Sequence, residues 1–169
     1  MKTGHESHAH ERFDRRQAMW LIGFLVLTFG AAAIGTMATT PAIDDWYRRL
    51  EMPALTPPSW VFSPVWTLLY VLMAIAAWIV WRRGGLHRAR LALSLFLIQL
   101  ALNAGWSIIF FGMRRPGLAL VELAVLWVAI LATLIAFSRW SRTAAWLLAP
   151  YLAWVTFAGY LNWGIWRLN

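Results

Sequence analysis

The sequence predicts an all-α integral membrane protein, built as one bundle of five transmembrane helices. Hydrophobic residues fill 61% of the 169 positions and charged residues only 13%, whereas soluble domains have about 45–50% and about 25%. A globule of this size would still need polar side chains over its surface, so lipid is the simpler solvent. The apolar runs show no strict alternation of apolar and polar residues, which argues against a β-barrel.

Five apolar runs define the predicted helices, and they cover residues 19–39, 61–81, 89–112, 117–137 and 143–166. Each run has 21 to 24 residues, enough to cross about 30 Å of hydrocarbon at about 1.5 Å per residue. Residues 1–18 are predicted to form a polar N-terminal tail, and residues 19–169 the transmembrane domain. The first run is too long for the apolar part of a signal peptide, and acids as well as bases flank it.

The first loop, residues 40–60, is the only long connection, and its prolines Pro41, Pro53, Pro57 and Pro58 are expected to stiffen it. Residues 44–50 are candidates for a short interfacial helix. The other loops have only a few residues, so neighbouring helices are predicted to be adjacent and antiparallel. A long, stiff loop over the end of a bundle is where a lid is expected.

Lysine and arginine residues predict the orientation in the membrane. Ten of them fall in the tail and in the second and fourth loops, and five on the opposite side. The excess predicts a cytoplasmic N-terminus, in a bacterial inner membrane because the spans are helical. The net charge of +8 fits this topology better than nucleic-acid binding, because the arginines separate apolar runs in twos and threes.

Several kinds of chemistry have no support in the sequence. The chain has no cysteine, which excludes disulfides and thiolate chemistry. His5, His8 and His10 could hold a metal ion, but a solvated tail explains them equally well, and no metal site is predicted. A Ser/His/Asp set, a pair of buried carboxylates and a phosphate-binding glycine loop are all absent.

Aromatic residues of the second helix fall into two groups. Trp60 precedes the helix and is expected to anchor it at the headgroups. Trp66, Tyr70, Met73 and Ala77 repeat at helical spacing and therefore share one face deeper in the helix. That face serves either helix packing or ligand contact.

The third helix carries a stripe of polar and aromatic residues, namely Gln99, Asn103, Trp106 and Phe110. Amide side chains are costly in lipid unless they hydrogen-bond inside the bundle. They therefore either join neighbouring helices or point into a cavity lined by indoles.

The fifth helix has a matching stripe, which consists of Tyr151, Trp154, Ala158 and then Leu161 or Asn162. A small residue at 158 would let a flat molecule approach the backbone, and Pro150 could kink the helix. Three such stripes predict one apolar pocket with a few hydrogen-bond donors, suited to a flat hydrophobic ligand.

Glu122 is the only acid inside a predicted helix. An intramembrane carboxylate is a candidate for function. A structural role is the simpler interpretation, because Glu122 could reach the interface or pair with Arg114 or Arg115.

Pairs of small residues four apart permit close helix contacts and a homodimer. They are Ala31/Gly35, Ala101/Gly105 and Ala132/Ala136. Such pairs also arise by chance in alanine-rich helices.

Three blocks of sequence resemble the tryptophan-rich sensory protein/translocator protein (TspO/MBR) family, also called the peripheral benzodiazepine receptor. They are WYRRLEMPALTPPSWVFSPVWTLLYVLM, QLALNAGWSIIFFGMRRPGLALVEL and PYLAWVTFAGYLNWGIWRLN. The resemblance implies a five-helix membrane protein that is commonly a homodimer, and that is known in outer membranes as well. It also implies binding of porphyrins such as protoporphyrin IX and, in many members, of cholesterol and benzodiazepine-type ligands.

The resemblance also implies a set of pocket residues. Trp46 and Tyr47 of the first loop, Trp66, Asn103, Trp106, Trp154, Ala158 and Leu161 occupy the matching positions. Trp66 and Trp154 match the pair tied to porphyrin degradation. Leu55 replaces a tryptophan usual in the loop, so lid contacts are expected to differ. Trp163 stands where the C-terminal cholesterol pattern needs a tyrosine, which makes sterol binding through that pattern doubtful.

The predicted function is therefore a membrane receptor or regulator that binds porphyrins and modulates tetrapyrrole transport or stress signalling. The alternatives are an enzyme that degrades protoporphyrin IX under light, with Trp66 and Trp154 as catalytic residues, and a sterol- or lipid-handling protein. No cofactor is expected beyond the porphyrin as ligand. The predicted ligand-binding residues are Trp46, Tyr47, Trp66, Tyr70, Gln99, Asn103, Trp106, Phe110, Trp154, Ala158 and Leu161.

Overall fold

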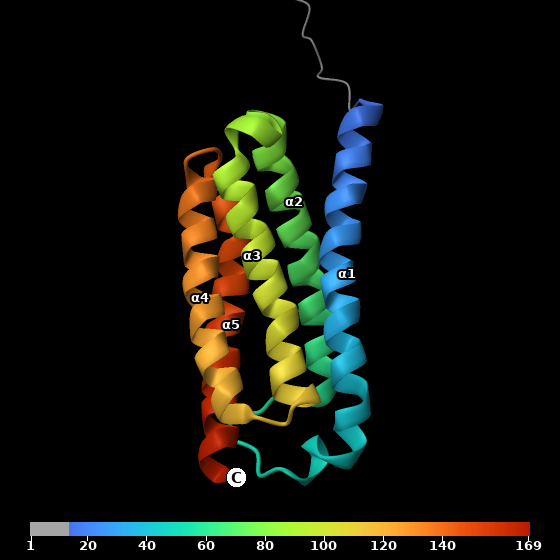
Figure 1. Ribbon diagram of the computed structural model, residues 1–169, viewed down its shortest axis with the longest axis vertical. Helices are drawn as coiled ribbons and strands as arrows, with labels where there is room; N and C mark the ends of the chain where they lie inside the picture. The colour runs from blue at the N-terminus through green and yellow to red at the C-terminus, as the bar shows by residue number, and fades with distance from the viewer. Residues whose placement is uncertain (1–13) are drawn as a thin grey trace, which may run out of the picture.

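A computed structural model describes residues 14–169. Within them the chain forms five helices that are long and apolar enough to cross a membrane, which confirms the predicted architecture (Figure 1). They are α1 (Arg15–Asp45), α2 (Phe62–Arg88), α3 (Arg90–Ser107), α4 (Pro116–Ser138) and α5 (Arg142–Leu168). The predicted histidine-containing segment lies outside the described residues, and residues 15–18 of the predicted tail are the start of α1.

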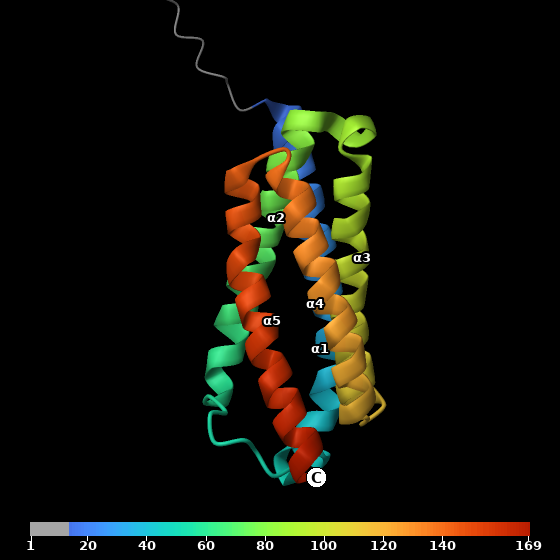
Figure 2. The same cartoon turned by 90° about the vertical axis from the view of Figure 1, so that its left-hand side faces the viewer.

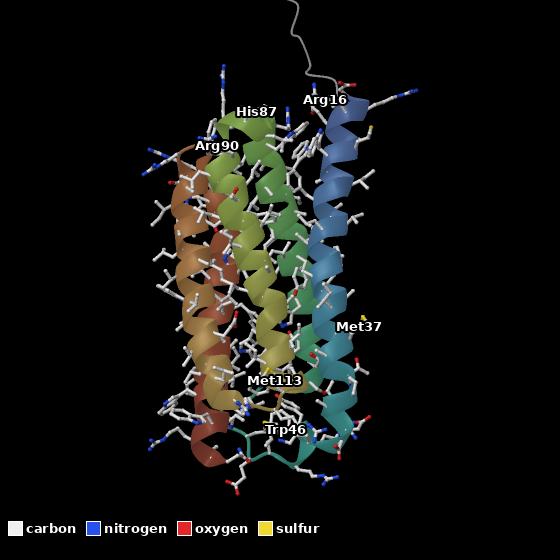
Figure 3. All side chains as sticks on the ribbon, in the orientation of Figure 1. Arg16, Met37, Trp46, His87, Arg90 and Met113 are labelled. Atoms are coloured by element: carbon white, nitrogen blue, oxygen red, sulfur yellow. The ribbon has the colours of Figure 1, made fainter. Side chains whose placement is uncertain are left out.

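The helices run side by side with alternating direction, as the short loops predict (Figures 1 and 2). Helical structure satisfies the backbone within each segment, which a lipid environment requires. Charged side chains gather at the two ends. The labels in Figure 3 mark the two ends: Arg16, His87 and Arg90 lie at one end of the bundle, and Trp46 and Met113 lie at the other.

Helix ends follow local chemistry. Gly85 has φ 63°, a left-handed conformation that favours glycine, and α2 changes direction there. Pro116 occupies the first turn of α4, where a missing N–H costs nothing. The Oγ of Ser141 accepts a hydrogen bond from the Ala144 N–H at 3.3 Å and caps α5. α5 continues through Pro150 without interruption, and the kink that this residue could open there stays a prediction.

The predicted boundary between α1 and the first loop was wrong. α1 continues through Pro41 to Asp45, six residues beyond the predicted end at Thr39. Pro41 is exposed, so its ring and its missing N–H affect only the outer edge of the helix. The next residue, Ala42, is only 3% exposed, and its packing holds the last turn against the bundle. The predicted interfacial helix is correspondingly reduced to a 3₁₀ turn, η1 (Tyr47–Arg49).

The rest of the first loop contains one turn, at Ala54 and Leu55, before a second 3₁₀ turn, η2 (Ser59–Val61), leads into α2. Two hydrogen bonds tie this loop to the end of α5. The Glu51 N–H donates to Oδ1 of Asn169 at 3.1 Å, and Nδ2 of Asn169 donates to the Glu51 carbonyl at 3.2 Å. Pro53 lies against Gly164, where an added Cβ would overlap its ring. The loop is therefore held against α5.

The bundle divides into two halves along its length. The closed half comprises residues 73–88 of α2, 90–100 of α3 and 142–151 of α5. Here Ala74, Ala76, Ala77 and Phe96 are completely buried, and Trp20 stacks on Trp81 with ring centroids 4.8 Å apart. The open half comprises residues 62–70, 103–112 and 154–168, next to the first loop.

Candidate functional site

A cavity of about 920 Å³ occupies the open half. α1, the first loop, α2, α3 and α5 contribute its walls, whereas α4 contributes none. Small residues of α1 (Ala32, Ala33 and Gly35) leave room on one side, and aromatic rings form most of the opposite walls. The volume lies within the range of about 300–1,000 Å³ typical of small-molecule sites.

The wall contributed by α2 contains Phe62, Trp66 and Tyr70. The indole of Trp66 stacks on the ring of Tyr70, with centroids 5.6 Å apart and an interplanar angle of 27°. It also meets Tyr151 of α5 edge-on at 6.3 Å. Trp66 is thus fixed by rings on two helices, whereas Trp60 is 73% exposed outside the cavity. This difference matches the separation of the two indoles into an anchor and a pocket residue.

Asn103 of α3 connects three helices at the inner end of the cavity. The Tyr70 hydroxyl donates to Oδ1 of Asn103 at 2.6 Å, and Nδ2 of Asn103 donates to the Tyr151 hydroxyl at 3.1 Å. Asn103 and Tyr151 are 4% and 0% exposed. Buried polar groups need such partners. The two predicted roles, helix connection and cavity lining, therefore coincide in Asn103.

A second amide, Asn162 of α5, holds Trp106. The Trp106 indole N–H donates to Oδ1 of Asn162 at 3.0 Å, and Nδ2 of Asn162 donates to the Pro116 carbonyl at 2.8 Å. Trp106 also stacks on Phe110 at 5.1 Å. Both Leu161 and Asn162 line the cavity, so the two alternatives for this position of the stripe are both present.

α5 adds Trp154 and Ala158 to the wall, and Phe62 meets Trp154 edge-on at 5.8 Å. Within residues 14–169, the indole N–H groups of Trp66 and Trp154 make no hydrogen bond, in contrast with that of Trp106. Two unpaired donors, one on α2 and one on α5, therefore belong to residues of the cavity wall. The two tentative catalytic residues face the same cavity from different helices.

Tyr47 of the first loop closes one side of the cavity. Its ring contacts Phe110 at 6.3 Å and Phe111 at 5.4 Å. Burial raises the pKa of the Tyr47 phenol above its ordinary value of 10.0, so the group is neutral at physiological pH. Leu55, at the position where the resemblance implies a tryptophan, is 66% exposed and does not line the cavity.

Two of the predicted ligand-binding residues, Trp46 and Gln99, lie outside the cavity wall. Trp46 meets Phe110, a residue of the cavity wall, edge-on at 5.7 Å. Gln99 is 1% exposed and lies 3.9 Å from the Met73 sulfur through Nε2, one turn of α3 nearer the closed half than Asn103. All the other predicted residues line the cavity.

The α1 wall escaped the sequence-based prediction. Gly35 packs so closely on α3 that an added Cβ would lie 3.0 Å from Oγ of Ser107, which confirms the close contact expected from the Ala31/Gly35 pair. Thr36, Thr39 and Thr40 also line the cavity, and each donates its hydroxyl proton to a carbonyl of the preceding turn at 2.8–2.9 Å. Small residues and threonines carry little signal for a binding site.

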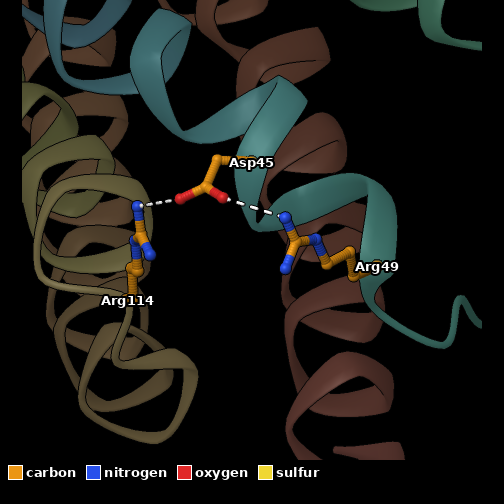
Figure 4. Close-up of polar contacts among 3 residues, drawn as sticks. All are labelled: Asp45, Arg49 and Arg114. Carbon is orange, nitrogen blue, oxygen red and sulfur yellow. Dashed lines mark hydrogen bonds and ion pairs between the residues drawn. The ribbon is translucent and has the colours of Figure 1, made fainter.

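Asp45 at the end of α1 forms ion pairs with two segments near the cavity mouth (Figure 4). Oδ1 accepts from Arg49 at 3.1 Å and Oδ2 from Arg114 at 2.9 Å. Arg114 lies between α3 and α4 with φ 55°, a conformation that is strained for a residue other than glycine. These contacts join the first loop to the α3–α4 connection.

Glu122 does not pair with Arg114 or Arg115, as one interpretation of the sequence had it. Its carboxylate oxygens are buried and have no hydrogen-bond partner within residues 14–169. A Cβ at Gly105 of α3 would lie 3.8 Å from Oε1. Glu122 therefore faces α3 and contributes nothing to the cavity wall.

The described residues contain no group of three or more metal-ligating side chains. The site offers aromatic surface, two open indole donors and amides that are already engaged. These groups can contact an apolar surface and donate hydrogen bonds to acceptors.

Comparison with known proteins places the chain among membrane proteins of one kind. The model of the TspO/MBR family matches residues 24–167. The tryptophan-rich protein TspO of Chlorobaculum tepidum is 44% identical over 77% of this chain and 84% of its own length. The tryptophan-rich sensory protein of Cereibacter sphaeroides is 43% identical over 86% and 91%. The human translocator protein is 44% identical over 73% and 75%.

Proposed function

The chain belongs to the TspO/MBR family of integral, multi-pass membrane proteins, and from this premise we propose that it is a receptor for porphyrins. The ligands would be tetrapyrroles of the protoporphyrin IX type and similar flat hydrophobic molecules. Binding would modulate tetrapyrrole transport or stress signalling. The translocator names of related proteins are in keeping with a transport role.

One observation carries the proposal: aromatic walls from separate helices enclose about 920 Å³ and leave two indole donors unused. Flat conjugated rings stack favourably on indoles. The pyrrole and carboxyl groups of a porphyrin include acceptors for the indole N–H groups. The engaged amides, by contrast, hold the walls at a fixed separation, so the cavity is formed before the ligand arrives.

A tryptophan fluorescence titration with protoporphyrin IX tests the proposal. We expect quenching at micromolar porphyrin, and a weaker affinity for Trp154→Phe. Trp60→Phe is the matched control, because Trp60 lies outside the cavity, and it should keep the wild-type affinity. Absence of quenching at micromolar porphyrin would overturn the proposal.

Light-dependent degradation of bound protoporphyrin is the second candidate. The observation that favours it is the pair of cavity indoles, Trp66 of α2 and Trp154 of α5, which line the same cavity. Illumination of the complex should bleach porphyrin absorbance faster than in a Trp66→Phe/Trp154→Phe variant. Trp60→Phe/Trp163→Phe is the matched control, since both indoles are at least half exposed. Equal bleaching rates in all three proteins would exclude this activity.

We also propose that the N-terminal end faces the cytoplasm, because that end carries the arginine-rich second and fourth loops (Figure 3). The chain has no cysteine, so single cysteines report topology cleanly. Leu55→Cys in the exposed first loop should react with an impermeant thiol reagent in intact cells. His87→Cys should react only after permeabilisation, and the reverse result would contradict the orientation. The homodimer and the sterol ligand implied by the family remain predictions.

A further inference from the structure

Arg48 is the only charged side chain among the described residues that line the cavity. It belongs to η1, at the loop end of the open half. The rest of the wall is uncharged: it is mostly aromatic, aliphatic or hydroxyl-bearing, and it includes the amides Asn103 and Asn162. A cation therefore lies at the loop end of an otherwise uncharged cavity.

The ion pair between Arg48 and Asp44 is weak. Nη2 of Arg48 lies 3.1 Å from Oδ1 of Asp44, and the two side chains are 72% and 77% exposed. Ion pairs at this exposure contribute little, because solvent screens them and both side chains lose freedom. An anion on a bound molecule can therefore share the guanidinium, which has five N–H donors in a planar fork.

The remaining polar groups of the cavity point to the same kind of ligand. The oxygens of Asn103 and Asn162 already accept hydrogen bonds from Tyr70 and Trp106. The indole N–H groups of Trp66 and Trp154 have no hydrogen-bond partner within residues 14–169, and they can only donate. Two unpaired donors on the walls and a cation at the loop end favour a ligand that carries acceptors and a negative charge.

We infer that Arg48 selects ligands with a carboxylate at one edge of a flat apolar body, and that the carboxylate lies at the loop end. The inference rests on the proposed function and specifies how the ligand is oriented. The apolar body contacts the indoles, and the acid group stays at headgroup depth, where its charge is least costly. A flat ligand without an acid group would lack this contact.

The chain contains its own control. Arg49 is the next residue, has an ion pair of the same length with Asp45, and is 77% exposed, yet it does not line the cavity. Arg48→Gln and Arg49→Gln therefore remove the same charge from the same loop. Only the first removes it from the cavity.

The test compares protoporphyrin IX with its dimethyl ester, which keeps the macrocycle and lacks the acid groups. Titrations use the full-length protein in a neutral detergent. We expect Arg48→Gln to weaken protoporphyrin IX binding about five- to tenfold, a moderate effect because solvent screens the site. Ester binding should change less than twofold, and Arg49→Gln should change the affinity for either ligand less than twofold.

Two further variants sharpen the test. Arg48→Lys should restore part of the affinity for the acid, and Asp44→Asn, which frees Arg48, should raise it. Equal binding of the acid by the wild type and Arg48→Gln, with the ester also bound, would overturn the inference and leave the proposed function intact. Equal losses in Arg48→Gln and Arg49→Gln would show a general effect of loop charge and overturn the inference as well. If neither porphyrin binds the wild type, both proposals fail.

Discussion

In the closed half of the bundle, α2 presents Ala74, Ala76 and Ala77 to its neighbours, and all three are completely buried. In the open half, the same helix presents Trp66 and Tyr70 to a cavity of about 920 Å³. Small side chains let helix backbones approach closely in lipid, whereas rings fixed edge-on keep the helices apart. Stability therefore depends mainly on the closed half of these helices, and binding depends on the open half of the same helices.

The largest effect is expected from adding bulk to each half. Ala74→Phe forces a ring into a filled core, and we expect a loss of about 3 kcal/mol or more in the free energy of unfolding. Ala158→Phe places the same ring in the cavity, so the protein should fold normally and lose at least about tenfold in porphyrin affinity. Denaturation in detergent and the fluorescence titration measure the two effects. Similar stability losses in both variants would abolish the distinction between the halves.

Removal of a ring gives the next largest effect. Phe96 is completely buried and packs on Phe24 and Phe137. Lipid solvates an exposed phenyl ring well, so Phe96→Ala should lose mainly the void term. That term is about 2 kcal/mol, at ~24 cal/mol per Å³ for about 100 Å³. Phe62→Ala, on the cavity wall, is the control and should cost less than half as much in the same denaturation assay.

The boundary between the halves depends on Asn103. Asn103→Leu removes two hydrogen bonds and leaves the hydroxyls of Tyr70 and Tyr151 without this partner. We expect a loss of about 1–2 kcal/mol, on the scale of interhelical bonds in membranes. A double-mutant cycle with Tyr151→Phe measures the coupling. Strict additivity of the two substitutions would mean that the network does not join α3 to α5.

The smallest effect on stability is expected at the cavity mouth. Asp45→Asn breaks the ion pairs with Arg49 and Arg114, which are exposed and together contribute less than about 1 kcal/mol. Porphyrin release should nevertheless become about two- to threefold faster, because the first loop is held less firmly. Stopped-flow release experiments test this, with Glu51→Gln as a control that removes one charge from the same loop. High salt should erase the difference between wild type and Asp45→Asn; a difference that persists in high salt would argue against an ionic contact.

The sequence predicts the five spans well because length and hydropathy determine them. The end of α1 was missed because Pro41 is typical of a loop, whereas the burial of Ala42 depends on tertiary packing. Of the cavity residues on α2, α3 and α5, those in the aromatic and amide stripes were predicted from helical spacing, whereas Phe62, Thr67 and Ser107 were missed.

Gln99 shows the limit of that method. It shares a helix face with Asn103, but periodicity gives direction around a helix and not depth along the bundle. Gln99 lies beyond the end of the cavity, next to Met73. Trp46 lies in a loop, where no periodicity applies. The sequence did not predict the wall formed by α1, because Gly35 and its neighbours contribute to the cavity only through the space that they leave open.

The contact between Gly164 and Pro53 has a practical consequence. Because a side chain at Gly164 would overlap the proline ring, Gly164→Ala should displace the first loop while leaving the rings of the cavity untouched. The added methyl group would then hold the first loop away from α5 and widen the entrance of the cavity. Such a variant would let the rate of ligand entry be measured separately from the affinity of the cavity for its ligand.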